Sequence, residues 1–96
     1  MSKNSDTFSA KVKDVVRKIP KGKVLTYGQV AKKAGSEKAY RAVASIMSKN
    51  YAPDVPCHRV VRADGGLAGY NRGGIEEKAK ILSREGVKLQ GFKVVL

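Results

Sequence analysis

Apolar residues recur at helical spacing near the start of the chain. Five of them fall on one face of a helix: Phe8, Val12, Val15, Val16 and Ile19. Ser5 or Asp6 could cap the first turn of this helix, and Pro20 marks its end. The pattern therefore predicts a first helix that buries one face against the rest of the domain.

A capping box follows a short extended segment at Val24 and Leu25. Thr26 and Gln29 are spaced so that each side chain can bind the backbone N–H of the other residue, an arrangement that opens many helices. The sequence therefore predicts a short helix from Tyr27 to about Lys33.

A further helix is predicted after a glycine. Gly35 favours the end of one helix, and Ser36 can cap the next, which reaches about Lys49. Its apolar face carries Ala39, Val43, Ile46 and Met47. Two short helices joined by a tight turn, over about 27–49, resemble a DNA-binding helix-turn-helix, although many helical hairpins share this pattern.

The second half of the chain is richer in turns. Residues 51–56 are expected to form a loop, and the β-branched end of 57–61 is too short to assign. Residues 64–66 predict a turn, 69–74 a glycine-rich loop, and 75–86 a final helix that stops at its glycine. Alternation predicts a terminal strand from three apolar residues: Phe92, Val94 and Leu96. We expect a mainly helical domain with a small β component.

Length and charge narrow the possibilities. Ninety-six residues suffice for one compact domain, so a single domain over 1–96 is expected. The formal net charge of +12 indicates an acidic partner such as nucleic acid, although a solvated basic surface or an RNA-binding protein would show the same balance. No apolar stretch suits a membrane span or a secretory signal, so we expect an intracellular protein, in the cytoplasm of a prokaryote or the nucleus of a eukaryote.

The single cysteine requires its own explanation. Cys57 has no partner for an internal disulfide, and with one histidine in the chain a structural zinc site is not expected. It stands in Pro56-Cys57-His58-Arg59-Val60, where neighbouring basic groups favour the nucleophilic thiolate. The alternative is a small buried apolar residue, which is the commoner role of an isolated cysteine.

At this point the sequence resembles the C-terminal domain of the O6-alkylguanine-DNA alkyltransferases, also called methylated-DNA–protein-cysteine methyltransferases. The resemblance runs from about Phe8 to Leu89. It is carried, in order, by residues 22–28, Arg41-Ala42-Val43, Asn50, residues 56–60, Gly69-Tyr70, Lys78 and Glu85-Gly86. It implies a winged-helix-like helix-turn-helix domain that needs no cofactor, acts as a monomer, and transfers an alkyl group from O6-alkylguanine in double-stranded DNA to its own cysteine. O4-alkylthymine is a second substrate to consider.

The resemblance assigns the chemistry to four residues. Cys57 is the acceptor, and the thioether it forms is permanent, so the protein is consumed in one turnover. An unperturbed thiol, with a pKa of about 8.5, is mostly protonated at pH 7, so a base is needed. Glu85 and His58 would supply it with a bridging water, because neighbours in an extended segment point to opposite sides. Tyr27 would help turn the phosphate and donate its hydroxyl to N3 of the leaving guanine.

The resemblance also implies how DNA is held. The lesion must rotate out of the stack, and Arg41 would enter the vacated space while the helix-turn-helix docks in the minor groove. Ala42 and Ser36 are also expected to contact DNA. By residue type alone, Arg41 could be an ordinary phosphate contact and Tyr27 a core residue.

Five further residues are expected to form or support the base pocket: Met47, Asn50, Val60, Tyr70 and Asn71. Asn50 would tie the recognition helix to the active-site loop, the Val60 carbonyl and loop amides near Asn71 would read the guanine edge, and Tyr70 and Met47 would pack against the base. All of these roles come from the resemblance.

Three departures from the family pattern and two alternatives remain. The N-terminal domain usual in the family is absent from the resemblance, the spacer from Tyr51 to Val55 looks one residue short, and the loop at 71–74 looks one residue long. Alkyltransferase-like proteins share this domain, lack the reactive cysteine, and mark lesions for nucleotide excision repair; Cys57 argues against that class. A plain helix-turn-helix regulator would explain Arg41 but gives no reason for residues 56–60.

Overall fold

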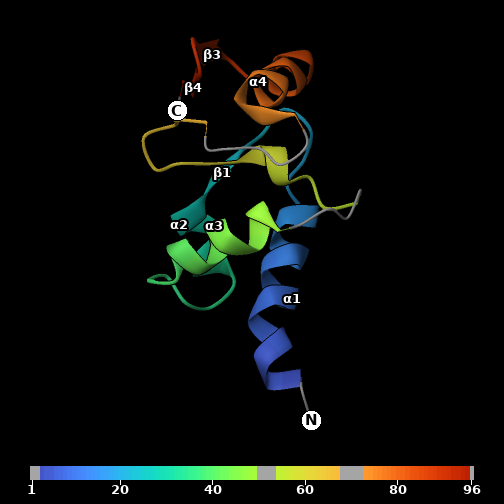
Figure 1. Cartoon of the computed structure of the whole chain (residues 1–96), viewed down its shortest axis with the longest axis vertical. Helices are drawn as coiled ribbons and strands as arrows, with labels where there is room; N and C mark the ends of the chain where they lie inside the picture. Colours follow the sequence, from blue (N-terminus) through green and yellow to red (C-terminus); the bar gives the residue numbers. More distant parts are fainter. Residues whose placement is uncertain (1–2, 50–53, 68–72, 96) are drawn as a thin grey trace.

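The computed structural model describes residues 3–49, 54–67 and 73–95, with side chains from Phe8 onward. In these ranges the chain forms four α-helices, one 3₁₀ turn and four short strands, which confirms the mainly helical class. The molecule measures 44 × 23 × 20 Å, and its long axis follows α1 (Lys3–Arg17), whose N-terminal end projects from the body (Figure 1).

The first helix begins earlier than the sequence predicted. Ser5 and Asp6 lie inside its first turns, so the prediction that either caps it is wrong. The apolar periodicity starts only at Phe8, but a helix does not require apolar residues in its first turns, so its start was not visible in that pattern. At its other end, α1 stops shortly before Pro20, as the missing N–H of proline requires.

The predicted capping box is confirmed. The Thr26 side-chain hydroxyl accepts from the N–H of Gln29 at 3.1 Å, and Oε1 of Gln29 accepts from the N–H of Thr26 at 2.9 Å. The extended segment before it forms β1 (Leu25–Thr26), and α2 spans Tyr27–Lys33 as predicted. This local signal therefore fixes where the first helix of the helix-turn-helix begins.

The second helix of the pair, α3 (Tyr40–Ser48), begins later than predicted, and Ser36 does not cap it. The N–H of Ser36 instead binds the Ala31 carbonyl at 2.9 Å, and the N–H of Gly35 binds that of Lys32 at 3.0 Å. This is a Schellman arrangement, with Gly35 at a φ of 96°. Ser36 therefore completes the end of α2, and α3 starts from Ala39 without a side-chain cap.

A parallel pair of strands separates two small cores. β1 pairs with β2 (Val60–Val61), with Leu25 opposite Val60. Successive strand residues point to opposite faces. Val60 accordingly packs into a larger cluster built mainly from α1, α2 and α3, while Val61 packs into a second cluster with Leu82.

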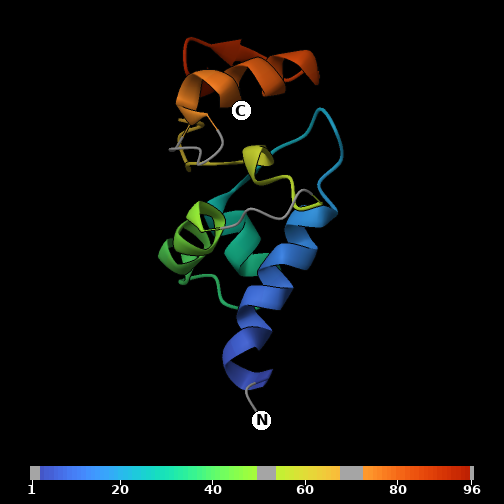
Figure 2. The same ribbon diagram turned by 45° about the vertical axis from the view of Figure 1, so that its right-hand side comes forward.

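The second cluster lies beneath α4 (Gly74–Arg84) and a hairpin of β3 (Leu89–Gln90) and β4 (Lys93–Val94). These elements form the end of the molecule opposite the free end of α1 (Figures 1 and 2). The predicted terminal strand is confirmed only in part. Val94 is buried in β4, but Phe92 is 53% exposed in the hairpin turn, which opens at Gly91 with a φ of 63°. Leu96 lies outside the described residues.

Candidate active site and nucleic-acid interface

Cys57 lies at the start of η1 (Cys57–Arg59), a 3₁₀ turn between Pro56 and β2. It is 5% exposed and packs in the larger core cluster. Its N–H donates to the Val55 carbonyl at 2.8 Å, and its carbonyl accepts from the N–H of Val60. The thiol is therefore presented from a backbone held on both sides.

The expectation that Cys57 and His58 lie in an extended segment is wrong, because the hydrogen bond that closes η1 bends the chain there. Successive residues of a 3₁₀ turn project about 120° apart. The side chains of His58 and Cys57 therefore still point in different directions. The cause is the 3₁₀ turn and not the alternation of a strand.

Glu85, the C-cap residue of α4, binds the two residues that follow the cysteine, His58 and Arg59. Its Oε2 lies 3.0 Å from Nε2 of His58. Arg59 binds the same carboxylate with two nitrogens, Nε to Oε1 at 2.9 Å and Nη2 to Oε2 at 2.7 Å, while Nη1 donates to the Ile19 carbonyl at 2.9 Å. The guanidinium offsets the unfavourable field that a helix C-terminus exerts on a carboxylate.

These contacts set the charge states of Glu85 and His58. Hydrogen bonds from Arg59 first, and from His58 second, lower the pKa of Glu85 to about 2. Burial lowers the pKa of His58 and outweighs the opposing effect of Glu85. At neutral pH the carboxylate is therefore ionised and the imidazole neutral, so Nε2–H donates to Glu85 and Nδ1 is the basic nitrogen. His58 is suited to accept a proton.

Lys78 brings a buried cation to the same region. Its side chain is 1% exposed, and Nζ donates to the Val60 carbonyl at 2.8 Å. Burial lowers the pKa of Lys78 to about 8, whereas negative charge on Cys57 raises it. The bond to Val60 holds this amine against the strand that directly follows the Cys57 turn.

Tyr27 opens α2 beside the same cluster. Burial, followed by the charge of Cys57, raises the pKa of its hydroxyl. Tyr27 therefore remains a protonated hydrogen-bond donor at neutral pH, near the thiol.

The candidate DNA contacts lie on the helix-turn-helix. Arg41 and Ala42 are exposed in the first turn of α3, with the Arg41 guanidinium carbon 6.0 Å from the centroid of the Tyr40 ring. Ser36 is exposed in the turn between α2 and α3. All three are accessible from outside the domain.

Of the five candidate pocket residues, two lie within the described ranges: Met47 and Val60. Met47 is 4% exposed in the cluster that contains Cys57, and the Val60 carbonyl already accepts one hydrogen bond, from Lys78. A carbonyl oxygen has two lone pairs, so that of Val60 can accept a second donor. Asn50, Tyr70 and Asn71 lie outside the described residues, as do 51–53 and 71–72 of the two loops whose lengths were expected to differ from the family pattern.

Two contacts at the site were not predicted: the pairing of Arg59, expected only as a basic neighbour of Cys57, with Glu85, and the burial of Lys78. Arg59 stands within the motif around the cysteine, but its partner Glu85 is distant in sequence, so no local pattern could reveal the pair. Lys78 did leave a signal. It falls at helical spacing from Ile75 and Leu82, on the apolar face of α4, where a lysine is unexpected unless its ammonium group has a buried partner.

Within the described ranges, no group of three or more histidine, cysteine, aspartate or glutamate side chains could hold a metal ion. Among the helices of the same ranges, none has the length and apolar character required to cross a membrane.

Comparisons with known proteins show which family the chain belongs to. Residues 7–87 match the sequence profile of the 6-O-methylguanine DNA methyltransferase, DNA binding domain. The methylated-DNA–protein-cysteine methyltransferase of Methanothermobacter thermautotrophicus is 46% identical over 85 residues, which are 88% of this chain and 47% of that protein. The crystal structure of Mycobacterium tuberculosis O6-methylguanine methyltransferase gives a TM-score of 0.74 at 40% identity, over 82% of this chain and 48% of that one.

A second solved structure, S. pombe Atl1 in complex with damaged DNA containing O6-carboxymethylguanine, gives a TM-score of 0.78 at 31% identity, over 93% of this chain and 86% of that one. A helix-turn-helix that leads into a cysteine turn thus defines a DNA-binding domain of the alkyltransferase type. The chain belongs to the 6-O-methylguanine DNA methyltransferase family. It spans about half the length of the M. thermautotrophicus methyltransferase.

Proposed function

We propose that this chain repairs DNA directly, by taking an alkyl group from O6 of guanine onto Cys57. One observation carries the proposal: beside the cysteine, Nε2 of His58 lies 3.0 Å from an ionised Glu85. A neutral imidazole held by a carboxylate is the arrangement that activates a nucleophile.

The transfer follows from these charge states. The Cys57 proton passes through a water to Nδ1 of His58, and the ammonium group of Lys78 supports the resulting thiolate. Sγ then attacks the alkyl carbon, and the S–C bond forms as the O6–C bond breaks. The electron pair remains on guanine, whose N3 accepts a hydrogen bond from the Tyr27 hydroxyl; guanine gains its proton from solvent, and His58 returns the Cys57 proton to solvent. The thioether cannot be reversed by this machinery, so each molecule acts once.

Mass spectrometry tests this proposal. After incubation with duplex DNA that contains O6-methylguanine, we expect one added methyl group per protein, located on the peptide that carries Cys57. The same duplex with ordinary guanine should leave the mass unchanged. A folded protein of unchanged mass after complete exposure to the lesion would contradict the transfer.

A second candidate function is lesion recognition without transfer. It is favoured by the likeness to S. pombe Atl1, of which this chain covers 86%, in a complex with damaged DNA. The same incubation distinguishes the two functions, because a recognition protein would bind the lesion duplex more tightly than the undamaged duplex and keep its mass.

The exposed position of Arg41 suits the role of filling the space that a flipped guanine leaves. Arg41→Ala should slow transfer from duplex DNA, because the flipped state loses part of the few kcal/mol that offsets unstacking. Each 1.4 kcal/mol lost slows the rate about tenfold where flipping is limiting. Transfer from the free base O6-benzylguanine, measured in parallel, should be nearly unchanged. Equal losses on both substrates would mean that Arg41 shapes the fold or the pocket instead.

A further inference from the structure

A cavity of about 390 Å³ lies where the end of α1, the turn that follows it and α2 meet. Most of its lining is apolar: Val15, Ile19, Pro20, Val24 and Leu25. Pro20 is exposed, so the cavity reaches the surface. A hollow of this size and composition can accept a bulky apolar side chain.

Three exposed lysines complete the lining, Lys18, Lys23 and Lys33, and no acidic residue is among the lining side chains. The ion pairs of the described residues engage other basic groups: Asp14 and Asp54 are bound to Arg17, and Glu85 is bound to His58 and Arg59.

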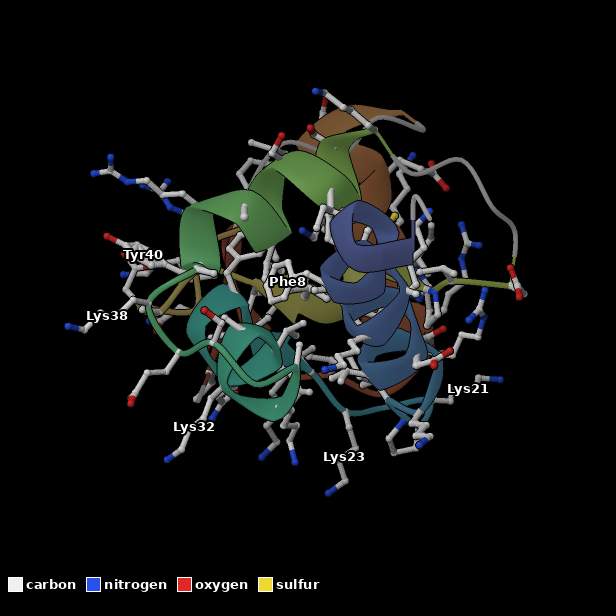
Figure 3. The ribbon with its side chains drawn as sticks, turned by 90° about the horizontal axis from the view of Figure 1, so that it is seen from below. Phe8, Lys21, Lys23, Lys32, Lys38 and Tyr40 are labelled. Atoms are coloured by element: carbon white, nitrogen blue, oxygen red, sulfur yellow. The ribbon has the colours of Figure 1, made fainter. Side chains whose placement is uncertain are left out.

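The helix dipole of α2 stabilises a positive charge in its last turn, where Lys33 lies. Lys23 lies outside a helix, so no helix dipole accounts for its charge there. Figure 3 shows Lys21, Lys23 and Lys32 projecting outward along the lower side of that view, while Tyr40, at the start of α3, projects from its left side. Lys18, Lys23 and Lys33 therefore place positive charge beside the apolar part of the cavity.

We propose that this cavity binds an acidic segment of a partner protein, which inserts an apolar side chain while its carboxylates face the three lysines. A patch of one charge around an apolar hollow favours a partner with the opposite arrangement. Duplex DNA fits less well because its outer surface offers phosphates and no apolar group to fill the hollow. The candidate DNA contacts Arg41 and Ala42 also lie on a different element, α3. The segment could therefore bind while the protein is on DNA, and the inference goes beyond the repair reaction.

A nuclear magnetic resonance titration of the wild-type protein tests the location. The probe is a synthetic peptide of glutamates and aspartates around a central Leu-Phe pair. Shifts of backbone amide signals should gather at Val15, Ile19 and Leu25 and spare α3. Shifts spread over all exposed lysines, or gathered on α3, would overturn the proposal.

Charge reversal tests the chemistry. Lys23→Glu/Lys33→Glu should weaken binding of the fluorescein-labelled peptide about tenfold or more, a difference of about 1.4 kcal/mol. The matched control Lys80→Glu/Lys88→Glu makes the same change in net charge at exposed positions on and after α4 and should have little effect. Thermal unfolding of both variants checks that they are folded.

Three results would contradict the proposal. Equal weakening by both double variants would indicate general charge attraction. Equal binding of a peptide with the Leu-Phe pair changed to serines would exclude insertion of an apolar group. Displacement of the peptide by duplex DNA, together with weaker DNA binding of Lys23→Glu/Lys33→Glu, would assign the surface to nucleic acid.

Discussion

Cys57→Ala is expected to abolish alkyl transfer while lesion binding persists. The chain has one cysteine, so no other thiol can accept the group. The substitution removes one sulfur atom from a position that is 5% exposed, which should cost about 1 kcal/mol in the free energy of unfolding and leave the domain folded. The candidate DNA contacts on α3 are untouched. Transfer is measured by mass, and binding by fluorescence anisotropy with an O6-methylguanine duplex.

Cys57→Ser provides the matched control, because it keeps the shape of the side chain with a much poorer nucleophile. It should also fail to accept the alkyl group. Methyl transfer to any other residue in either variant would show that the cysteine is not the acceptor. Loss of lesion binding in both folded variants would mean that Cys57 acts in recognition.

Glu85→Gln is expected to slow transfer about a hundredfold or more, from duplex DNA and from free O6-benzylguanine alike. Glutamine keeps the shape of the side chain but lacks the charge that holds Arg59 and orients His58. Both substrates need the thiolate, so both rates should fall together, unlike the selective loss expected for Arg41→Ala. Single-turnover rates for the two substrates check this, and a loss confined to duplex DNA would contradict the relay.

The same variant should differ in its stability toward acid. The pKa of Glu85 falls from an ordinary value of 4.5 to about 2 in the folded protein, so its contribution to stability is complete above about pH 4.5 and is lost as the pH falls toward 2. Glu85→Gln removes this contribution, and urea unfolding should show a smaller loss of stability over that interval than in wild type. Equal losses would place the acid sensitivity elsewhere.

Sequence predicted those parts of the fold that depend on neighbouring residues. The capping box of Thr26 and Gln29 set the start of α2 because both hydrogen bonds form within one helical turn. Ser36 was assigned to the wrong helix because a serine after a glycine can serve either the end of one helix or the start of the next, and backbone hydrogen bonds to α2 decide which.

The candidate site depends on distant contacts, so the sequence indicated its members but not all of their connections. The family resemblance paired His58 with Glu85, and the structure brings them together. It gave no role to Arg59, although the Arg59 guanidinium largely sets the charge state of that carboxylate. Nor did it indicate that Lys78 donates to Val60, a contact that requires α4 to dock on β2.

The bond between Arg59 and the Ile19 carbonyl joins residues forty positions apart, and Glu85 follows later still. Contacts within and between α1, α2 and α3 close short loops and are expected to form first, whereas β2 and α4 must close long ones. During synthesis the helix-turn-helix can therefore fold before Glu85 has been added to the chain. Under the proposed function, a nascent chain would then have a DNA-binding surface with an unactivated thiol, and the cysteine would become reactive only once the C-terminal helix has docked.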